Sequence, residues 1–403
     1  MGVNADSAAA HRLKTSINHM KTLPLRVPPG AADDLLGQYS RTANTLLSRN
    51  ILAMMRFVVV GAGALGNEVV KNLGLLGAGS VTVIDSDRIE LPNLSRSVFF
   101  RASDCGRPKA EALCLSLSSA FPDTRWEYHN CEVADVGFAK LSGANLILTC
   151  VDSDLARIET AWISQRMNIP MADGGLGGAD YWRGRVSFFA GRSSACFCCK
   201  LSPGRRRELL SLSLSTGHSC WASAEMIPNP STPTMAAIVG ALQVDFGLRC
   251  LNENSGTQDL KSPTIEITLD SNVGLRRFVT PLSSGCPFHN VSEQRSAPLF
   301  HPRVSVREFL DSENAHIVDL DWPICVEARC LDCDADWKPM RRVAWLRRYG
   351  SCPACGSHRV LENQNISSLD RNSAWADTPL VDLGLPEQHL FTVRPATRQE
   401  GRA

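Results

Sequence analysis

Closely spaced glycines follow a short apolar run near the start of residues 57–109. Gly61, Gly63 and Gly66 have the GxGxxG spacing and come directly after the apolar run 57–60. In such a turn the glycines let the chain bend tightly, approach a phosphate and pack a helix against the strand. The unpaired N–H groups at the start of that helix attract an anion. The pattern therefore predicts a nucleotide-binding loop.

An acid and a group of polar side chains follow this loop. Asp85 ends the next apolar run, 81–84, where it is placed to accept hydrogen bonds from ribose hydroxyls. The loop and Asp85 alone would predict NAD or FAD by default. The residues that come next are a second acid, an amide and two cations: Asp87, Asn93, Arg96 and Lys109. Because Arg and Lys bind phosphate oxygens, this set suits a triphosphate and its metal ion.

The sequence of this stretch resembles that of the ubiquitin-activating-enzyme superfamily, which includes the ThiF, MoeB and HesA adenylyltransferases. The resemblance is carried by GAGALGNEVVKNL, DSDRIELPNLSR and GRPK, and it covers roughly residues 38 to 290. The chain departs from the family pattern at Ala64, Pro92 and Ser97, none of which removes a phosphate ligand. The resemblance implies an adenylating enzyme that uses ATP and magnesium.

The resemblance also implies roles for two residues outside this stretch. Asp152 follows the apolar run 145–151 and matches the family's magnesium ligand, at the strand end where α/β sheets bind ligands. A helix N-cap is the alternative role for Asp152. Arg41, in the helical pattern 33–55, matches an arginine that commonly reaches the triphosphate in the partner subunit, which implies a homodimer. A solvated helix arginine is the alternative.

A cysteine lies in the segment 201–233, which is rich in Ser and Gly and predicts a mobile crossover loop. Members of the family that form a thioester carry a Cys in this position, which implies that Cys220 is a nucleophile. His218 is two residues away and would lower the pKa of the thiol. The alternative is a small apolar contact.

Two further groups of residues have the spacing of metal ligands. The resemblance places a CxxC pair at the first group, which implies a tetrahedral structural zinc site made by Cys196, Cys199, Cys286 and His289, with Cys198 as a substitute ligand. The second group has zinc-ribbon spacing, with eighteen residues between its two pairs: Cys330, Cys333, Cys352 and Cys355. A competing assignment pairs Cys196 and Cys199 with Cys352 and Cys355. Between the ribbon pairs, residues 337–350 predict a hairpin, and the arginines there favour a solvated face: Arg341, Arg342, Arg347 and Arg348.

The elements that must position these residues predict an α/β fold. We expect a Rossmann-like, doubly wound and mostly parallel sheet with a zinc-stapled C-terminal part and an appended zinc ribbon. The predicted strands and helices are, in order, helix 33–55, strand 57–60, a helix from 66 to about 76, strand 81–84, helix 104–120, strands 126–131 and 145–151, two strands within 169–190, helix 234–249, and strands 264–269 and 275–280. The expected divisions are a flexible extension over 1–32, an adenylation domain over 33–297, a ribbon module over 298–383 and a flexible tail over 384–403.

Composition narrows the class of partner. The net charge is +1, so we do not expect nucleic acid as a partner. The sequence contains no run of 18 or more apolar residues, so we do not expect a membrane span. The chain has 15 Cys and no visible secretory signal, which favours zinc and thiol chemistry in the cytoplasm over disulfides.

The function predicted from the resemblance is activation of the C-terminal carboxylate of a ubiquitin-like protein with ATP. Arg96, Lys109 and Arg41 would offset charge as the carboxylate attacks the α-phosphate, and no general base is needed because a carboxylate is ionised at pH 7. Cys220 would then carry the protein as a thioester for a conjugating enzyme. In a bacterium such a protein could serve phage defence. The alternatives are a sulfur-carrier adenylyltransferase of thiamine or molybdopterin synthesis, an NAD-binding oxidoreductase, and a non-catalytic partner subunit.

Overall fold

The computed structural model describes residues 48–395 except 178–179, 193, 215–219, 222–230, 254–261, 272, 290–294 and 299–302. The side chains of 214, 220–221 and 295–298 are also outside the description. Arg41 and His218 lie outside the described residues. The helix predicted over 33–55 is described only as α2, Arg49–Met54.

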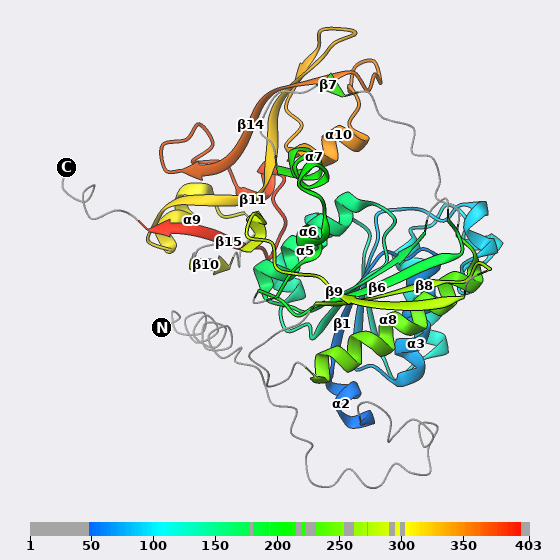
Figure 1. Ribbon diagram of the computed structural model, residues 1–403. Helices are drawn as coiled ribbons and strands as arrows, with labels where there is room; N and C mark the ends of the chain where they lie inside the picture. Colours follow the sequence, from blue (N-terminus) through cyan, green and yellow to red (C-terminus); the bar gives the residue numbers. More distant parts are fainter. Residues whose placement is uncertain are drawn as a thin grey trace.

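The first unit is built on a sheet of eight strands in the order β3-β2-β1-β4-β5-β6-β8-β9 (Figure 1). Five strands are parallel: β1 Arg56–Val60, β2 Ser80–Ile84, β3 Arg125–His129, β4 Leu146–Thr149 and β5 Met171–Leu176. The remaining three are antiparallel: β6 Arg183–Phe189, β8 Pro263–Thr268 and β9 Gly274–Val279. The predicted fold class, a mostly parallel Rossmann-like sheet, is confirmed.

Helices cover both faces of this sheet. Phe57 and Val59 point into one core, which contains residues of α3 Ala64–Leu76, α4 Lys109–Ala120 and α8 Pro233–Glu253. Val58 and Val60 point into the other core, which contains residues of α5 Asp154–Met167, α6 Phe197–Lys200 and α7 Pro203–Leu214. Strand β1 is therefore apolar throughout because it is buried on both faces.

Helix α8 is, among the residues described, the single helix long and apolar enough to cross a membrane. Its Met235, Val239 and Val244 are buried in the core with the first sheet. This burial accounts for its apolar composition.

The second unit has a sheet in the order β10-β15-β11-β14-β7, with β12 and β13 also paired to β11. Its strands are β7 Cys220–Trp221, β10 Arg295–Pro298, β11 Ala315–Cys330, β12 Asp336–Trp337, β13 Arg341–Arg342, β14 Val360–Asp370 and β15 Leu390–Pro395. Its helices are α9 Val306–Ser312 and α10 Val343–Tyr349. The short 3₁₀ helices of the chain are Leu91–Ser95, Ala102–Asp104, Val133–Asp135, Phe138–Leu141, Pro287–His289 and Leu380–Leu383.

The crossover segment differs from its prediction. Residues 203–214 of the predicted loop form α7, because Leu209 is buried in the second core and Arg206 donates from Nε to the carbonyl of Cys198 at 3.0 Å. Backbone groups of β7 then pair with β14, with Cys220 opposite Leu361. Tertiary packing therefore decides the structure of a segment without strong periodicity.

Two expectations for the C-terminal part are also corrected. The hairpin predicted over 337–350 is wrong from residue 343 onward, where α10 forms because Val343 and Leu346 pack beneath β11. The tail expected to be flexible from Gly384 contains β15, which pairs with β10 and β11 and buries Phe391 and Val393. Side chains that alternate along β15 enter the core of the second unit.

The arginines between the ribbon pairs do not form a solvated face. Arg342 has only 4% of its side chain exposed and ion-pairs with acids of the first unit. Arg347 has 5% exposed and donates two hydrogen bonds to Glu362, at 2.7 and 2.8 Å. Arg348 bonds to Glu132 at 2.8 Å. Of the four, Arg341 is exposed as expected.

The two units share a packed interface. Trp322 and Leu390 of the second unit are buried in the core of the first. The indole N–H of Trp162 donates to Asp321 at 2.9 Å, and Arg166 donates to the hydroxyl of Thr392 at 2.6 Å. The second unit therefore lies along α5, at the side of the first sheet seen in Figure 1.

Candidate functional site

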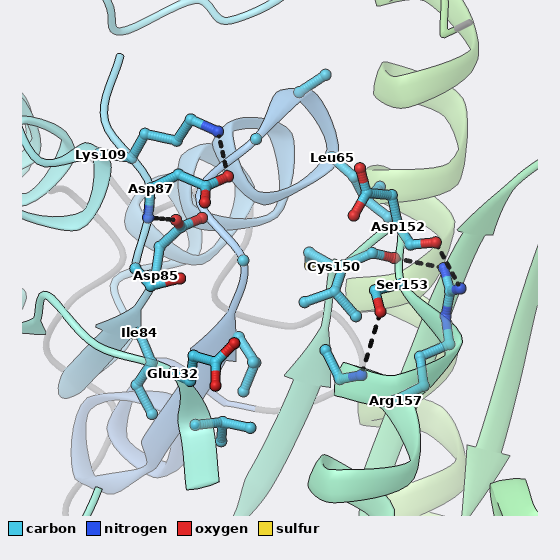
Figure 2. A pocket seen from close by; sticks show the side chains of 18 of the residues that line it. Leu65, Ile84, Asp85, Asp87, Lys109, Glu132, Cys150, Asp152, Ser153 and Arg157 are labelled. Carbon is cyan, nitrogen blue, oxygen red and sulfur yellow. Dashed lines mark hydrogen bonds and ion pairs between the residues drawn. The ribbon is translucent and has the colours of Figure 1, made fainter. Parts of the chain in front are cut away.

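A pocket of about 210 Å³ opens where β1, β2 and β4 end. Figure 2 shows it as a gap between Asp85, Asp87 and Lys109 on one side and Asp152 and Ser153 on the other. Eight of the predicted nucleotide ligands line it: Gly61, Gly63, Asp85, Asp87, Asn93, Arg96, Lys109 and Asp152. The carboxyl ends of neighbouring parallel strands are where such folds bind ligands.

The glycine loop has the geometry that its sequence requires. Gly61 has φ +100°, and a Cβ there would lie 2.7 Å from the carbonyl oxygen of Cys150. A Cβ at Gly66 would lie 2.0 Å from the carbonyl oxygen of Gly61, so this position packs the helix against the turn and does not line the pocket. Buried Asn67 donates to the carbonyls of Ala62 and Gly63, which holds the turn. The sequence analysis did not identify Asn67.

Asp85 is fixed by two backbone donors. The N–H of Ala62 donates to Oδ2 at 2.6 Å, and the N–H of Asp87 donates to Oδ1 at 2.7 Å. Burial raises the pKa of Asp85 to about 6, although the charge of Lys109 opposes this shift. The carboxylate therefore joins the first and second strand ends and retains lone pairs for a ligand.

The two predicted phosphate ligands have partners within the pocket. Lys109, the first residue of α4, bonds through Nζ to Asp87 at 2.8 Å. Burial disfavours its ammonium, but the charges of Asp85 and Asp87 raise the pKa of Lys109 overall. Arg96 donates to the hydroxyl of Ser231 at 3.0 Å, which links it to the end of the crossover segment. Lys109 is therefore charged at pH 7.

Asp152 is not the cap of α5. Ser153 is the N-cap, and its hydroxyl accepts from the N–H of Ala156 at 3.5 Å. Buried Arg157 donates to the carbonyl of Val151 and pairs with Asp173 at 3.0 Å, which orients the turn that carries Asp152. The Asp152 side chain is exposed toward the pocket. A carboxylate in this position fits a magnesium ion, which is commonly held by one or two carboxylates and substrate phosphates.

One wall of the pocket was not predicted from the sequence. This wall comes from the segment after β3, from α5 and from α10 of the second unit: Cys131, Glu132, Val133, Glu159, Arg348 and Tyr349. Burial raises the pKa of Glu159, against the opposing charge of Arg342. No local motif marks these residues, because they belong to segments far apart in the sequence.

Both metal-ligand groups form separate clusters in the described chain. In the first, Sγ of Cys196 is 3.6 Å from Sγ of Cys286, and Sγ of Cys199 is 3.2 Å from Nε2 of His289. In the second, the Sγ pairs Cys330–Cys355 and Cys333–Cys352 are each 3.6 Å apart. Four ligands at Zn–S distances of about 2.3 Å would be separated by similar lengths, so both donor sets fit tetrahedral zinc. The competing assignment that joins Cys196 and Cys199 to Cys352 and Cys355 is not formed.

A second cavity of about 200 Å³ lies at the ends of β5, β6 and β8. It is lined by small and charged residues that include Gly175, Gly177, Arg183 and Arg185. Leu176 lines both this cavity and the nucleotide pocket. The two cavities are therefore neighbours along the carboxyl edge of the sheet.

Part of the chain is similar in sequence to known proteins. Residues 39–286 match the family described as ThiF family. The NEDD8-activating enzyme E1 catalytic subunit of Caenorhabditis elegans is 32% identical over 162 residues, which cover 36% of this chain and 36% of that protein. Ubiquitin-like modifier-activating enzyme 5 of Drosophila virilis is 29% identical over 154 residues, covering 35% of this chain and 38% of that protein. The matched region thus spans well under half of these relatives.

A solved structure has a related fold. The crystal structure of Escherichia coli MccB with succinimide superposes with a TM-score of 0.50 at 17% identity, covering 72% of this chain and 82% of that chain. At this identity the likeness concerns the fold.

Proposed function

We propose that this chain, which belongs to the ThiF family, uses ATP to adenylate the C-terminal carboxylate of a ubiquitin-like protein. The observation that carries the proposal is one pocket that joins the glycine loop, Asp85, the two cations and Asp152. An NAD site would leave Arg96, Lys109 and Asp152 without a role. The relatives named as activating enzymes for NEDD8 and ubiquitin-like modifiers support the substrate class.

In this proposal each part of the nucleotide has its own ligands in the pocket. Gly63 has open space beyond its Cα, so backbone N–H groups at the start of α3 can approach a phosphate. Asp85 accepts from the ribose hydroxyls. Arg96 and Lys109 face the phosphates, and a ligand would compete for them with their present partners, Ser231 and Asp87. Asp152 would hold magnesium, which would neutralise phosphate charge when bound.

The reaction needs positioning and charge stabilisation more than proton transfer. A carboxylate oxygen of the substrate attacks the α-phosphorus and forms an acyl–O–P bond. The bond between the α-phosphorus and the bridging oxygen breaks, and pyrophosphate leaves with the electron pair. Arg96 and Lys109 stabilise the charge that develops on the phosphate oxygens. The substrate carboxylate is already ionised at pH 7, so no residue must deprotonate it.

The neighbouring cavity supports a polypeptide substrate. The cavity extends to Leu176 and is lined by the charged side chains of Arg183, Arg185 and Glu266, which a polypeptide terminus would contact on its way to the nucleotide. A chain terminus that entered there would reach the nucleotide pocket at the α-phosphate.

Pyrophosphate exchange into ATP tests the adenylation step. With the cognate small protein present, exchange should occur and should fall by about 10²-fold or more in Asp152→Asn. Asp154→Asn is the matched control, because Asp154 lies two residues away and does not line the pocket. Exchange that survives Asp152→Asn unchanged would refute the role of Asp152, and absence of exchange with any ubiquitin-like partner would refute the function.

We propose a second step in which the thiolate of Cys220 attacks the acyl-adenylate, releases AMP and carries the protein as a thioester to a conjugating enzyme. Pairing of the Cys220 backbone with β14 places this segment on the second unit. Cys220→Ala should retain exchange and lose an adduct that thiols cleave. An adduct that persists in Cys220→Ala would contradict this step, and a thiocarboxylate product would favour the sulfur-carrier alternative.

The oligomeric state and the cellular role of the enzyme are also proposed. A homodimer with Arg41 reaching the partner's site predicts a dimeric mass in solution and loss of exchange in Arg41→Ala. We propose a cytoplasmic location. A role in phage defence predicts neighbouring genes for a ubiquitin-like protein and a conjugating enzyme. Neighbours for thiamine or molybdopterin synthesis would contradict that role.

A further inference from the structure

We infer that Tyr349 and Arg348 of α10 form the base-binding wall of the nucleotide pocket, and that they recognise a purine by stacking. The inference rests on the proposed function, because it assigns the base end of the same site. These residues lie beyond the ThiF match, which ends at residue 286. Nucleotide recognition would then depend on the second unit of the molecule.

The order of strands sets the direction of the nucleotide. Along the carboxyl edge the order is β3-β2-β1-β4. The glycine loop follows β1, Asp85 follows β2, and the segment of Glu132 and Val133 follows β3. With phosphates at the loop and ribose at Asp85, the base is directed to the segment after β3. Figure 2 shows Glu132 on the Ile84 side of Asp85 and away from Lys109.

Helix α10 reaches this end of the pocket. Arg348 donates from Nη1 to Glu132 at 2.8 Å, and both Arg348 and Tyr349 line the cavity. The guanidinium carbon of Arg348 lies 5.0 Å from the centroid of the Tyr349 ring. Tyr349 remains 43% exposed, so its ring has surface left for a ligand. A flat aromatic ring beside a guanidinium is suited to stacking on a base.

A buried arginine positions this wall. Arg342, at the start of α10, donates to Glu132, Asp135 and Glu159, the last at 3.0 Å from Nη1. Both glutamates also line the pocket. Arg342 is therefore a positioning residue that holds α10 against the first unit.

The carboxylate of Glu132 is held by two arginines. Each carboxylate oxygen of Glu132 already accepts from an arginine, one from Arg342 and one from Arg348. The aromatic and apolar surface at this end includes Ile84, Val133 and Tyr349, and Glu159 also lines it. Stacking of the base on this surface favours purines over pyrimidines.

The test compares a ligand that has a base with one that lacks it. Binding of ATP and of inorganic tripolyphosphate to the full chain is measured by calorimetry. Tyr349→Ala and Arg348→Ala should each weaken ATP binding by about tenfold and leave tripolyphosphate binding unchanged. Tyr349→Phe should retain the affinity, because it keeps the ring. Arg341→Ala is the matched control, since Arg341 is exposed and outside the pocket lining.

Two outcomes overturn the inference: unchanged ATP affinity in Tyr349→Ala, or equal losses for both ligands. Failure of pyrophosphate exchange while these binding differences persist would refute the proposed function and leave the inference standing. If the alanine variants do not fold, photolabelling of the natural chain with 8-azido-ATP decides. The label should be found on the peptide that contains residues 343–349, and labelling confined to other peptides would overturn the inference.

Discussion

The two cysteine clusters have similar donor sets but stand in different surroundings. Cys196 and Cys286 are 1% and 0% exposed and belong to the large core on the α5 side of the first sheet. In the ribbon, Cys333 and Cys355 are exposed, and the nearest core contains five buried residues. A metal in the first cluster would join segments that already pack together, whereas the ribbon would depend on a bound metal, because it has little core.

The two clusters also differ in their distance along the chain from residues that line the nucleotide pocket. The first cluster lies beside α6 and α7, which do not line the pocket. The ribbon holds Cys352, three residues after Tyr349, the last residue of α10. We therefore expect the first cluster to act on global stability and the ribbon to act on nucleotide affinity.

The largest effect is expected from the first cluster. Cys286→Ser should lower the free energy of unfolding by about 4 kcal/mol or more, because it removes a fully buried ligand. Denaturant unfolding and bound zinc measure this change, with zinc falling from about two to about one per chain. Cys114→Ser, which alters a buried thiol outside either cluster, is the control. A loss no larger than that of the control would contradict a structural metal in the first cluster.

The interface between the units should respond next. Arg342→Met leaves Glu132, Asp135 and Glu159 without their shared partner, so the free energy of unfolding should fall by about 3–5 kcal/mol. Arg359→Met is the matched control, since Arg359 pairs with Asp332 at an exposed position of the ribbon and should cost about 0–1 kcal/mol. Equal losses in the two variants would show that the buried contact does not hold the units together.

The ribbon should affect affinity more than stability. Cys333→Ser should weaken ATP binding by about tenfold, because it loosens the end of α10, and should leave tripolyphosphate binding unchanged. Calorimetry measures both ligands. If folded Cys333→Ser protein binds ATP as tightly as the natural chain, the ribbon does not act on nucleotide affinity.

The smallest expected effect is a pH dependence that belongs to the first unit. The pKa of Asp85 is about 6, above its usual value of 3.8, because the group is buried. Since ribose needs the ionised acceptor, ATP affinity should fall several-fold as the pH drops from 7 to 5. On the other wall Tyr349 does not titrate in this range, because burial raises its pKa to about 12, whereas burial raises the pKa of Glu159 to about 7, so Glu159 adds its own part to the dependence. Asp85→Asn should remove this part of the dependence, and an unchanged profile in that variant would assign it to the phosphates.

The same pKa fixes the sign of a stability effect. A raised carboxyl pKa means that the ionised form is disfavoured in the folded protein. In the absence of nucleotide, the contribution of Asp85 to stability should be complete below about pH 4 and lost as the pH rises through about 6. Bound nucleotide should reduce this loss, because ribose hydroxyls would hydrogen-bond to the carboxylate.

Local spacing predicted the first unit well because its signals lie within single segments. Gly61 and Gly66 serve one turn, Asp85 ends the next strand, and Lys109 begins the following helix. The same reasoning failed for α7 and β15, whose serines and short alternating pattern carry no clear period. Their structure is decided by contacts with α5 and β11, which are distant in the sequence.

The amino-acid sequence by itself determined the Rossmann-like sheet, the glycine loop with its acids and cations, and the cysteine pairs with ligand spacing, whereas the folded chain decided that Cys196 and Cys199 join Cys286 and His289. These features follow from residue type and spacing within one βαβ unit or one CxxC pair. Tertiary structure alone decided that Arg342 is buried among three acids and that Tyr349 reaches the pocket. The reason is that an exposed and a buried arginine look alike in a sequence, and only the folded chain brings α10 against the segment that follows β3.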